Sequence, residues 1–241
     1  MPTTPDAATQ DEHLPEGAEK RAYVQEMFDR IAPRYDLLNT LMTFGLDRRW
    51  RVRTVRALGL APGQAVLDLA SGTGPLLATL RARGLRALGA DLSYEMLAAG
   101  GARAAGSLQG DAAALPLAGG ALDGVVSGFA LRNFADLGAT FAELARVLRP
   151  GGRLAILEVD RPANPLLRLG HRLWFERVVP RLGALLSDAR AYAYLPRSVA
   201  YLPDPSALAT ALEAAGFTAV TRLRLSGGLT QVVTATRRGD P

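Results

Sequence analysis

The fold of this chain is decided by the stretch Val66-Leu67-Asp68-Leu69-Ala70-Ser71-Gly72-Thr73-Gly74-Pro75, which is followed by a second apolar segment at residues 76–80. An apolar run, a few small residues and another apolar run predict a strand, a tight loop and a helix. Gly72 and Gly74 carry no side chain, so a ligand can lie directly against the main chain there. Pro75 fits the first helical position, where its missing N–H is not needed.

The spacing of these glycines argues against a dinucleotide site. The dinucleotide motif G-x-G-x-x-G would need its third glycine where Leu77 or, in the other register, Pro75 stands. Instead, three successive predicted strands end in an acidic residue, namely Asp68, Asp91 and Asp111. S-adenosylmethionine offers hydrogen-bond donors to such carboxylates through its ribose hydroxyls, its amine and its adenine amino group. Its sulfonium also favours an anionic rim over the positive helix end that a pyrophosphate prefers.

Each of these acids also has a structural interpretation. We favour Asp91 as the ribose ligand because its spacing from the glycine loop matches that of nucleoside sites. Asp68 is predicted to orient the loop and the amine of the ligand, or else to accept hydrogen bonds from the loop amides. Asp111 is predicted to contact the adenine, or else to be an ordinary turn residue.

Length and composition point to one globular domain. The chain has 241 residues, of which 49% are apolar, and a formal net charge of +5. It has no cysteine, which excludes disulfides and thiolate metal sites, and we expect no metal. The densest basic cluster, residues 47–53, has helical spacing and is predicted to be one solvated face, so we expect no nucleic-acid partner.

The sequence shows no targeting or membrane-spanning segment. The first residues are polar and proline-rich, unlike a secretory signal, and no apolar run approaches the roughly 20 residues that span a bilayer. We therefore expect a cytoplasmic protein. The basic charge is compatible with peripheral contact at the inner, anionic face of a membrane.

The chain is expected to divide into a disordered tail, residues 1–18, and a single domain, residues 19–241. Within the domain, residues 21–60 have helical spacing and are predicted to cover the site. Residues 162–200 are predicted to form an amphipathic insertion that packs on the core or touches lipid or a lipophilic ligand.

Strands and helices are expected to alternate, which favours right-handed βαβ units and an α/β fold. We predict a Rossmann-like, mostly parallel sheet with helices on both faces, closed by a C-terminal antiparallel hairpin. Helices are expected at residues 94–103, 136–148 and 205–215. Strands are expected at residues 66–69, 86–91, 107–110, 122–129, 153–159, 219–225 and 229–236.

The chain resembles the ubiquinone/menaquinone biosynthesis C-methyltransferases, a family of class I S-adenosylmethionine-dependent enzymes. The resemblance covers residues 21–230. It is carried by M-F-D-R-I-A-P-R-Y-D-L-L-N at residues 27–39, F-G-L at 44–46, W-R at 50–51, D-L-A-S-G-T-G at 68–74, G-D-A at 110–112, F-A-L-R-N at 129–133 and V-L-R-P-G-G at 147–152. It implies methylation of the ring of a polyprenylated quinol, with demethylmenaquinol favoured over the ubiquinone precursor. A homodimer is compatible with it.

The residue pattern and the resemblance together predict roles for individual residues, and the roles of Thr73, Asp91, Asp111, Ala112, Gly128 and Arg132 are the ones that the resemblance implies. The expected cofactor-binding residues are Asp68, Gly72, Thr73, Gly74, Asp91, Asp111, Ala112 and Gly128. The expected catalytic residues are Arg132, Asn133, Tyr35 and Asp36. Arg132 would polarise the quinol oxygen or hold a deprotonating water, and Asn133 would orient the same oxygen. The competing structural interpretations are an ion pair for Arg132, turn chemistry for Asn133 and a surface acid for Asp36.

Three departures from the family pattern leave other acceptors open. Pro75 replaces the acid that usually follows G-T-G, Val159-Asp160 replaces Phe-Ser, and the closing hairpin lacks His-x-Gly. The nearest alternative is a methyltransferase for another small lipophilic acceptor. An NAD-dependent oxidoreductase and a catalytically silent S-adenosylmethionine-binding protein are further alternatives.

Overall fold

A seven-stranded sheet forms the centre of the computed structural model, which describes residues 15–179, 181, 191, 194 and 197–239. The strands are β1 (Ala65–Leu69), β2 (Arg86–Asp91), β3 (Leu108–Gln109), β4 (Leu122–Gly128), β5 (Leu148–Val159), β6 (Phe217–Leu225) and β7 (Thr230–Arg237). Their order is β3-β2-β1-β4-β5-β7-β6. Strands β1 to β5 pair in parallel, whereas β7 runs antiparallel to both β5 and β6. The predicted α/β class and the closing antiparallel pair are confirmed.

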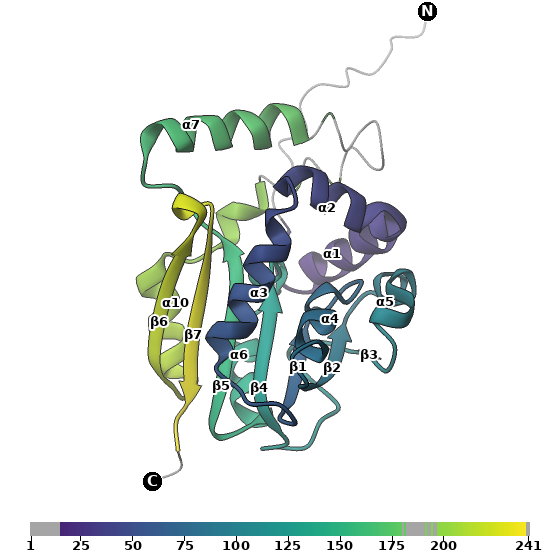
Figure 1. Ribbon diagram of the computed structural model, residues 1–241, viewed down its shortest axis with the longest axis vertical. Coiled ribbons are helices and arrows are strands. Elements are labelled where there is room, and N and C mark those ends of the chain that lie inside the picture. Colours follow the sequence, from purple (N-terminus) through teal and green to yellow (C-terminus); the bar gives the residue numbers. More distant parts are fainter. Residues whose placement is uncertain (1–14, 180, 182–190, 192–193, 195–196, 240–241) are drawn as a thin grey trace, which may run out of the picture.

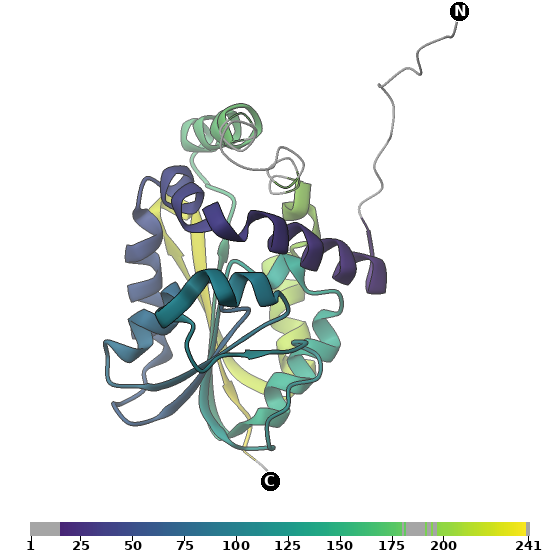
Figure 2. The ribbon, with the colours of Figure 1, turned by 90° about the vertical axis from the view of Figure 1, so that its right-hand side faces the viewer.

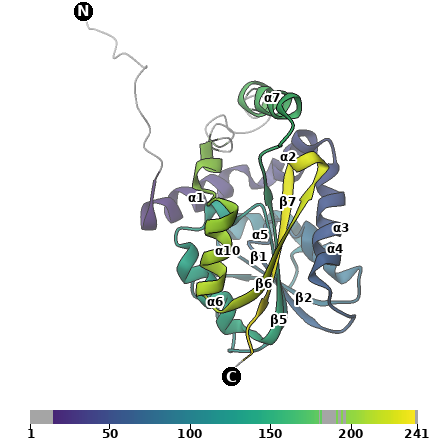
Figure 3. The ribbon, with the colours of Figure 1, turned by 90° about the vertical axis from the view of Figure 1, so that its left-hand side faces the viewer.

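Helices cover both faces of this sheet (Figure 1, Figure 3). Helices α3 (Leu46–Leu58) and α4 (Pro75–Arg81) lie on one face, and α6 (Leu137–Val147) and α10 (Pro205–Ala214) lie on the other. Helix α5 (Tyr94–Gly100) follows β2. Two of these helices begin with a capping side chain: the Ser93 hydroxyl accepts the Met96 N–H, and Asp136 accepts the Ala139 N–H.

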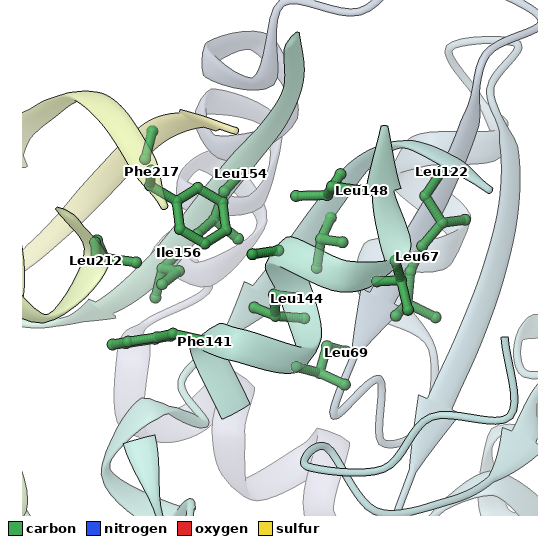
Figure 4. Close-up of a cluster of buried hydrophobic side chains, with 14 of the residues drawn as sticks. Leu67, Leu69, Leu122, Phe141, Leu144, Leu148, Leu154, Ile156, Leu212 and Phe217 are labelled. Carbon is green, nitrogen blue, oxygen red and sulfur yellow. The ribbon is translucent and has the colours of Figure 1, made fainter. Parts of the chain in front are cut away.

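Alternating side chains of the central strands build two cores. Leu67, Leu69 and Val125 join the apolar cluster beneath α6 and α10, which includes Phe141, Leu144, Leu212 and Phe217 (Figure 4). Val66 and Val126 point to the opposite face and pack with Val55, Leu58, Leu76 and Leu80 of α3 and α4. A central strand buried on both sides explains why its sequence is an unbroken apolar run.

Strand β5 starts earlier than predicted. Its pairing with β4 passes from Leu122–Leu148 directly to Gly124–Arg153, so residues 149–152 bulge out of the ladder. Pro150 and Gly151 lie in this bulge, where a residue without an N–H and a glycine with a φ of 76° are tolerated. The sequence marked these residues as a break between helix and strand, whereas the structure has the strand continue across them.

The N-terminal helices α1 (Gly17–Ile31) and α2 (Tyr35–Thr43) lie across the carboxyl ends of the parallel strands (Figure 2). Helix α1 begins within the segment expected to be disordered, and residues 1–14 of that segment lie outside the described residues. Helix α7 (Pro165–Leu173) stands at the same end of the sheet (Figure 1). Parts of the expected insertion, such as residues 182–190, lie outside the described residues. None of the helices described here has the length and apolarity needed to cross a bilayer.

Substitution of Gly89 by alanine is expected to destabilise the fold. A Cβ on this β2 residue would lie 2.3 Å from Ser107 Oγ, 2.7 Å from Ser71 Oγ and 2.8 Å from Leu77 Cδ1. Overpacking of this kind costs about 1–3 kcal/mol, which urea unfolding followed by circular dichroism would measure. The matched control is Gly170→Ala in α7, where nothing lies within 4 Å and helix propensity predicts a gain of up to about 1 kcal/mol. Equal stability of wild type and Gly89→Ala would contradict the packing described here.

Candidate functional site

A cavity of about 830 Å³ lies at the carboxyl ends of β1, β2 and β4, beneath α1. Open parallel sheets bind ligands at this edge. Of the residues predicted from the sequence, eight lie on its wall, namely Asp68, Gly72, Asp91, Asp111, Ala112, Gly128, Tyr35 and Asn133. Thr73, Gly74, Asp36 and Arg132 do not line it.

The glycine loop between β1 and α4 packs closely on its neighbours. Gly72 has a φ of 55°, and a Cβ there would lie 2.9 Å from Met96 Cε. Gly74 has a φ of 80°, and its Cβ would lie 2.9 Å from the carbonyl oxygen of Arg103. Gly74 therefore requires glycine for conformation and for space, whereas Gly72 requires it for conformation, because the end of the Met96 side chain can move. Ala70 and Phe129, at the ends of β1 and β4, adopt positive φ values of 55° and 61° without being glycine.

The Asp91 carboxylate joins the end of β2 to the glycine loop. Its Oδ2 accepts the Gly72 N–H at 2.7 Å and its Oδ1 accepts the Ser93 N–H at 2.9 Å. Burial raises the pKa of Asp91 to about 6, although both backbone donors stabilise the charged form. The carboxylate faces the cavity with acceptor capacity left over for a diol.

Asp68 is a fully buried carboxyl group on the cavity wall. Within the described part of the chain, neither of its oxygens has a hydrogen-bond partner. Burial raises its pKa to about 8, and the nearby Arg51 charge opposes that shift. A buried acceptor without a partner is costly, so a ligand that supplies a cationic donor, such as an ammonium group, fits this position.

The outer end of the cavity is formed by the loop after β3. Asp111 Oδ1 accepts the Ala113 N–H at 3.0 Å, and Asp111 Oδ2 forms an ion pair with Arg21 Nη1 at 3.0 Å. Asp111 is therefore both a turn residue and part of the cavity wall. Across the cavity, Gly128 ends β4, and a Cβ there would lie 2.8 Å from Leu76 Cδ1. Ala112 and Gly128 both line the cavity.

The side chain of Thr73, in the glycine loop, forms a hydrogen bond with that of Asp36 in α2. Thr73 Oγ1 donates to Asp36 Oδ1 at 2.6 Å, and the Arg103 guanidinium pairs with Asp36 Oδ2. Helix α2 is therefore attached to the glycine loop and to the turn after α5. The surface-acid interpretation of Asp36 is thus incomplete, because its carboxylate holds two other segments together.

Arg132 is buried in an ion pair next to the cavity. Its Nη1 binds Glu158, whose side chain is 1% exposed, and its Nε donates to Ser198 Oγ at 3.1 Å. Asn133 lies on the wall, where its Oδ1 accepts the Tyr194 hydroxyl at 3.4 Å. The structural interpretation of Arg132 as an ion pair therefore describes its geometry, and its catalytic role stays a prediction.

Tyr35 brings a phenol from the start of α2 to the cavity wall. Its ring contacts Phe28 of α1 edge-on, with centroids 6.0 Å apart. Burial raises the pKa of the Tyr35 hydroxyl above its usual range, so the phenol is neutral and can donate a hydrogen bond.

Arg51 is a wall residue that the sequence analysis missed. The prediction that residues 47–53 form a solvated face is wrong for three of them: Asp47 is 2% exposed, Trp50 is 6% exposed and the Arg51 side chain is 12% exposed. Arg51 pairs with Asp47 one turn earlier. A charged pair at this spacing is typical of exposed helices. For this reason the sequence did not indicate that Arg51 lines the cavity. Its position beside Trp50 in the matched W-R motif was the available signal.

The chemistry of the wall fits S-adenosylmethionine. Asp91 can accept the ribose hydroxyls, the unpaired Asp68 can accept the ammonium group, and the bare backbone of Gly72 and Gly128 admits the thioether chain. Among the described residues, no group of three His, Asp or Glu side chains is arranged to hold a metal ion.

Comparison with solved structures identifies the fold. The chain superposes with a TM-score of 0.64 on an S-adenosylmethionine-dependent methyltransferase of Thermotoga maritima, with 20% identity over 89% of this chain and 100% of that one. The TM-score is 0.65 for phosphoethanolamine N-methyltransferase 2 of Haemonchus contortus, solved with S-adenosylmethionine, with 14% identity over 89% of this chain and 60% of that one. The fold is that of the class I methyltransferases.

Sequence comparison defines the family within that class. The model of the ubiE/COQ5 methyltransferase family matches residues 16–237, so the chain belongs to this family. It is 44% identical to a demethylmenaquinone methyltransferase of Roseiflexus sp. (strain RS-1), over 94% of this chain and 98% of the relative. It is 42% identical to a ubiquinone/menaquinone biosynthesis C-methyltransferase UbiE of Syntrophotalea carbinolica, over 88% and 92% of the two chains.

The substitution Asp68→Asn is expected to stabilise the ligand-free protein increasingly as the pH rises. A carboxyl group whose pKa is raised from 3.8 to about 8 by folding costs the native state stability between these two values, because it ionises more easily in the unfolded chain. The gain of the variant over wild type in urea unfolding should therefore be small near pH 4 and grow until about pH 8.

Asp123→Asn provides the opposite control. The pKa of Asp123 is lowered, chiefly because its carboxylate accepts the Ala65 N–H. This variant should lose stability by a similar amount at pH 6 and pH 9, since the native carboxylate is ionised at both. A stability gain of Asp68→Asn that does not change with pH would contradict the burial of an unpaired acid.

Proposed function

We propose that this protein transfers the methyl group of S-adenosylmethionine to a ring carbon of demethylmenaquinol. The observation that carries the proposal is the cavity itself, whose acidic end suits the methyl donor while Phe28, Tyr35, Phe129 and Leu131 line it with aromatic and apolar surface. The relatives in Roseiflexus and Mycolicibacterium are named demethylmenaquinone methyltransferases. The name of the Syntrophotalea relative also covers ubiquinone, so the ubiquinone precursor is the second candidate acceptor.

The reaction needs alignment and a stabilised oxyanion. The bound donor supplies an electrophilic methyl group on a sulfonium. The quinol gains a nucleophilic ring carbon when its hydroxyl loses a proton to water. The carbon–carbon bond then forms as the carbon–sulfur bond breaks, the ring proton leaves to water and the oxygen regains a proton, so that one proton is released overall. The protein contributes orientation and exclusion of water.

We assign the acceptor-side roles as follows. The neutral Tyr35 phenol, at the start of α2, donates a hydrogen bond to the quinol oxygen. The Asn133 amide, in the turn after β4, orients the same oxygen. Arg132 supplies a fixed positive charge just behind Asn133, held by Glu158. Asp36 acts through Thr73 by positioning the glycine loop against which the donor lies. Thr73 and Gly74 belong to that loop and set its conformation.

The acceptor is a lipid, and we propose that the protein collects it at an anionic membrane surface. Leu166, Leu169 and Leu173 of α7 share one helical face and are 80%, 54% and 40% exposed. The ring of Phe44, which follows α2, has its centroid 4.6 Å from that of Trp174, directly after α7. The basic residues Arg168, Arg172 and Arg177 accompany these leucines. An apolar helical face with flanking arginines is typical of interfacial helices.

The methylation itself is tested with purified protein, methyl-labelled S-adenosylmethionine and demethylmenaquinol. Mass spectrometry should locate one labelled methyl group on the quinone ring. Asp91→Ala should abolish labelling and weaken S-adenosylhomocysteine binding by at least about 100-fold in calorimetry, because it removes the ribose acceptor and releases the glycine loop. Label found only on the ubiquinone precursor would transfer the assignment to that acceptor, and label on neither would refute it.

The membrane proposal is tested by co-sedimentation with vesicles that contain about 30% anionic lipid. The double substitution Leu166→Asp, Leu169→Asp should reduce binding at least about tenfold, because it places charge on the inserted face. The pair Ala207→Asp, Thr210→Asp on α10 adds the same charge at the same spacing and should leave binding unchanged. If the α7 variant instead converts a dimer to a monomer in ultracentrifugation without affecting vesicle binding, the surface is covered by a second copy of the chain.

A further inference from the structure

The proposed donor carries a charge for which the acidic residues provide no partner. Asp68, Asp91 and Asp111 suit its ammonium group, its ribose hydroxyls and its adenine amino group. The methionine part of the donor also has a carboxylate, which these three acids would repel. If S-adenosylmethionine binds here, as the proposed function requires, the inner end of the cavity needs a cation.

Three basic side chains line the cavity within the described part of the chain, and two of them are engaged with other groups of the protein. Lys20 Nζ donates to the Phe134 carbonyl oxygen at 2.9 Å and lies 3.6 Å over the Tyr201 ring. Arg21 pairs with Asp111. The third basic residue is Arg51, which comes from α3.

Arg51 is held in a fixed position with donors to spare. Its Nη1 pairs with Asp47, whose side chain is 3% exposed and accepts the Thr43 hydroxyl at 3.1 Å. Asp47 is the partner of Arg51 among the described residues, so Nε and Nη2 remain for a ligand. A guanidinium group fixed by one carboxylate loses little freedom when it binds a second one.

Arg51 and Asp68 both line the cavity. The Arg51 charge acts on both the Asp68 carboxyl group and the Tyr35 phenol. Asp68 is buried without a hydrogen-bond partner in the described structure. One cation and one buried anion on the wall of the same cavity form the complement of an amino acid zwitterion.

We propose that Arg51 binds the α-carboxylate of the methyl donor while Asp68 binds its ammonium group. Arg132 is not available for this role, because Glu158 and Ser198 hold it away from the wall. The alternative role for Arg51 is stabilisation of the quinol oxyanion, which would leave binding of the donor unaffected.

The test compares two ligands that differ in the amino acid part alone. S-adenosylhomocysteine has the carboxylate, whereas 5′-methylthioadenosine lacks the whole α-amino acid group. In calorimetry, Arg51→Met should weaken S-adenosylhomocysteine binding by about 10- to 100-fold, the range for loss of a charge-assisted hydrogen bond. Binding of 5′-methylthioadenosine should change less than about twofold, which also shows that the variant is folded. Arg51→Lys should be intermediate, because it keeps the charge and loses the planar fork.

Arg49→Met is the matched control, since Arg49 is an exposed residue on the same helix. It should bind both ligands like wild type. Unchanged S-adenosylhomocysteine binding by Arg51→Met, with or without slower methylation, would overturn the proposal. An equal loss for both ligands would indicate a structural role and would overturn it as well.

The result is separable from the identity of the acceptor. If the protein methylates no quinol but Arg51→Met still discriminates between the two ligands, the assignment of Arg51 stands and the proposed acceptor fails. If the wild-type protein binds neither ligand, both the cofactor assignment and the role of Arg51 are refuted.

Discussion

The site depends on the carboxylate of Asp91, which accepts hydrogen bonds from backbone N–H groups of two different loops. Asp91 ends β2 and accepts N–H groups from Gly72 in the preceding loop and from Ser93 at the start of α5. Each of these amides would otherwise lack a partner at the end of an element. The single side chain therefore fixes the distance between the two loops that form the cavity floor, and it does so while presenting its remaining acceptor capacity to a ligand.

The N-terminal helices are joined to this floor by polar contacts. Ser93 Oγ donates to Asp29 of α1, and Thr73 Oγ1 donates to Asp36 of α2. Arg21 reaches Asp111 from the first turns of α1. Each contact ends on a residue beside the predicted donor position, so cover and floor share one network of hydrogen bonds. Such networks are specific in geometry because every member needs its partner.

Much of this arrangement could be predicted from the sequence because local patterns determine it. Apolar runs with acidic ends predicted the central strands. The place of Asp68 and Asp91 at the ends of those runs predicted that both residues line a site. The bulge in β5 was missed because Pro150 and Gly151 are typical of a turn between a helix and a strand. Only the pairing with β4, which resumes after them, shows that the strand continues. Arg51 was missed, and the partner of Arg132 could not be named, for a related reason: their environments depend on helix packing and on Glu158, which no local pattern reveals.

Ala70 and Phe129 have a further consequence for the cavity. Both residues adopt left-handed backbone conformations without being glycine, at the ends of neighbouring central strands. Such conformations cost about 1–3 kcal/mol each and persist only where the surrounding structure imposes them. Here the two buried cores on either face of β1 and β4 do so. The cavity floor is thus preorganised by the folding of the sheet, so a bound ligand meets a surface whose shape the hydrophobic core has already set.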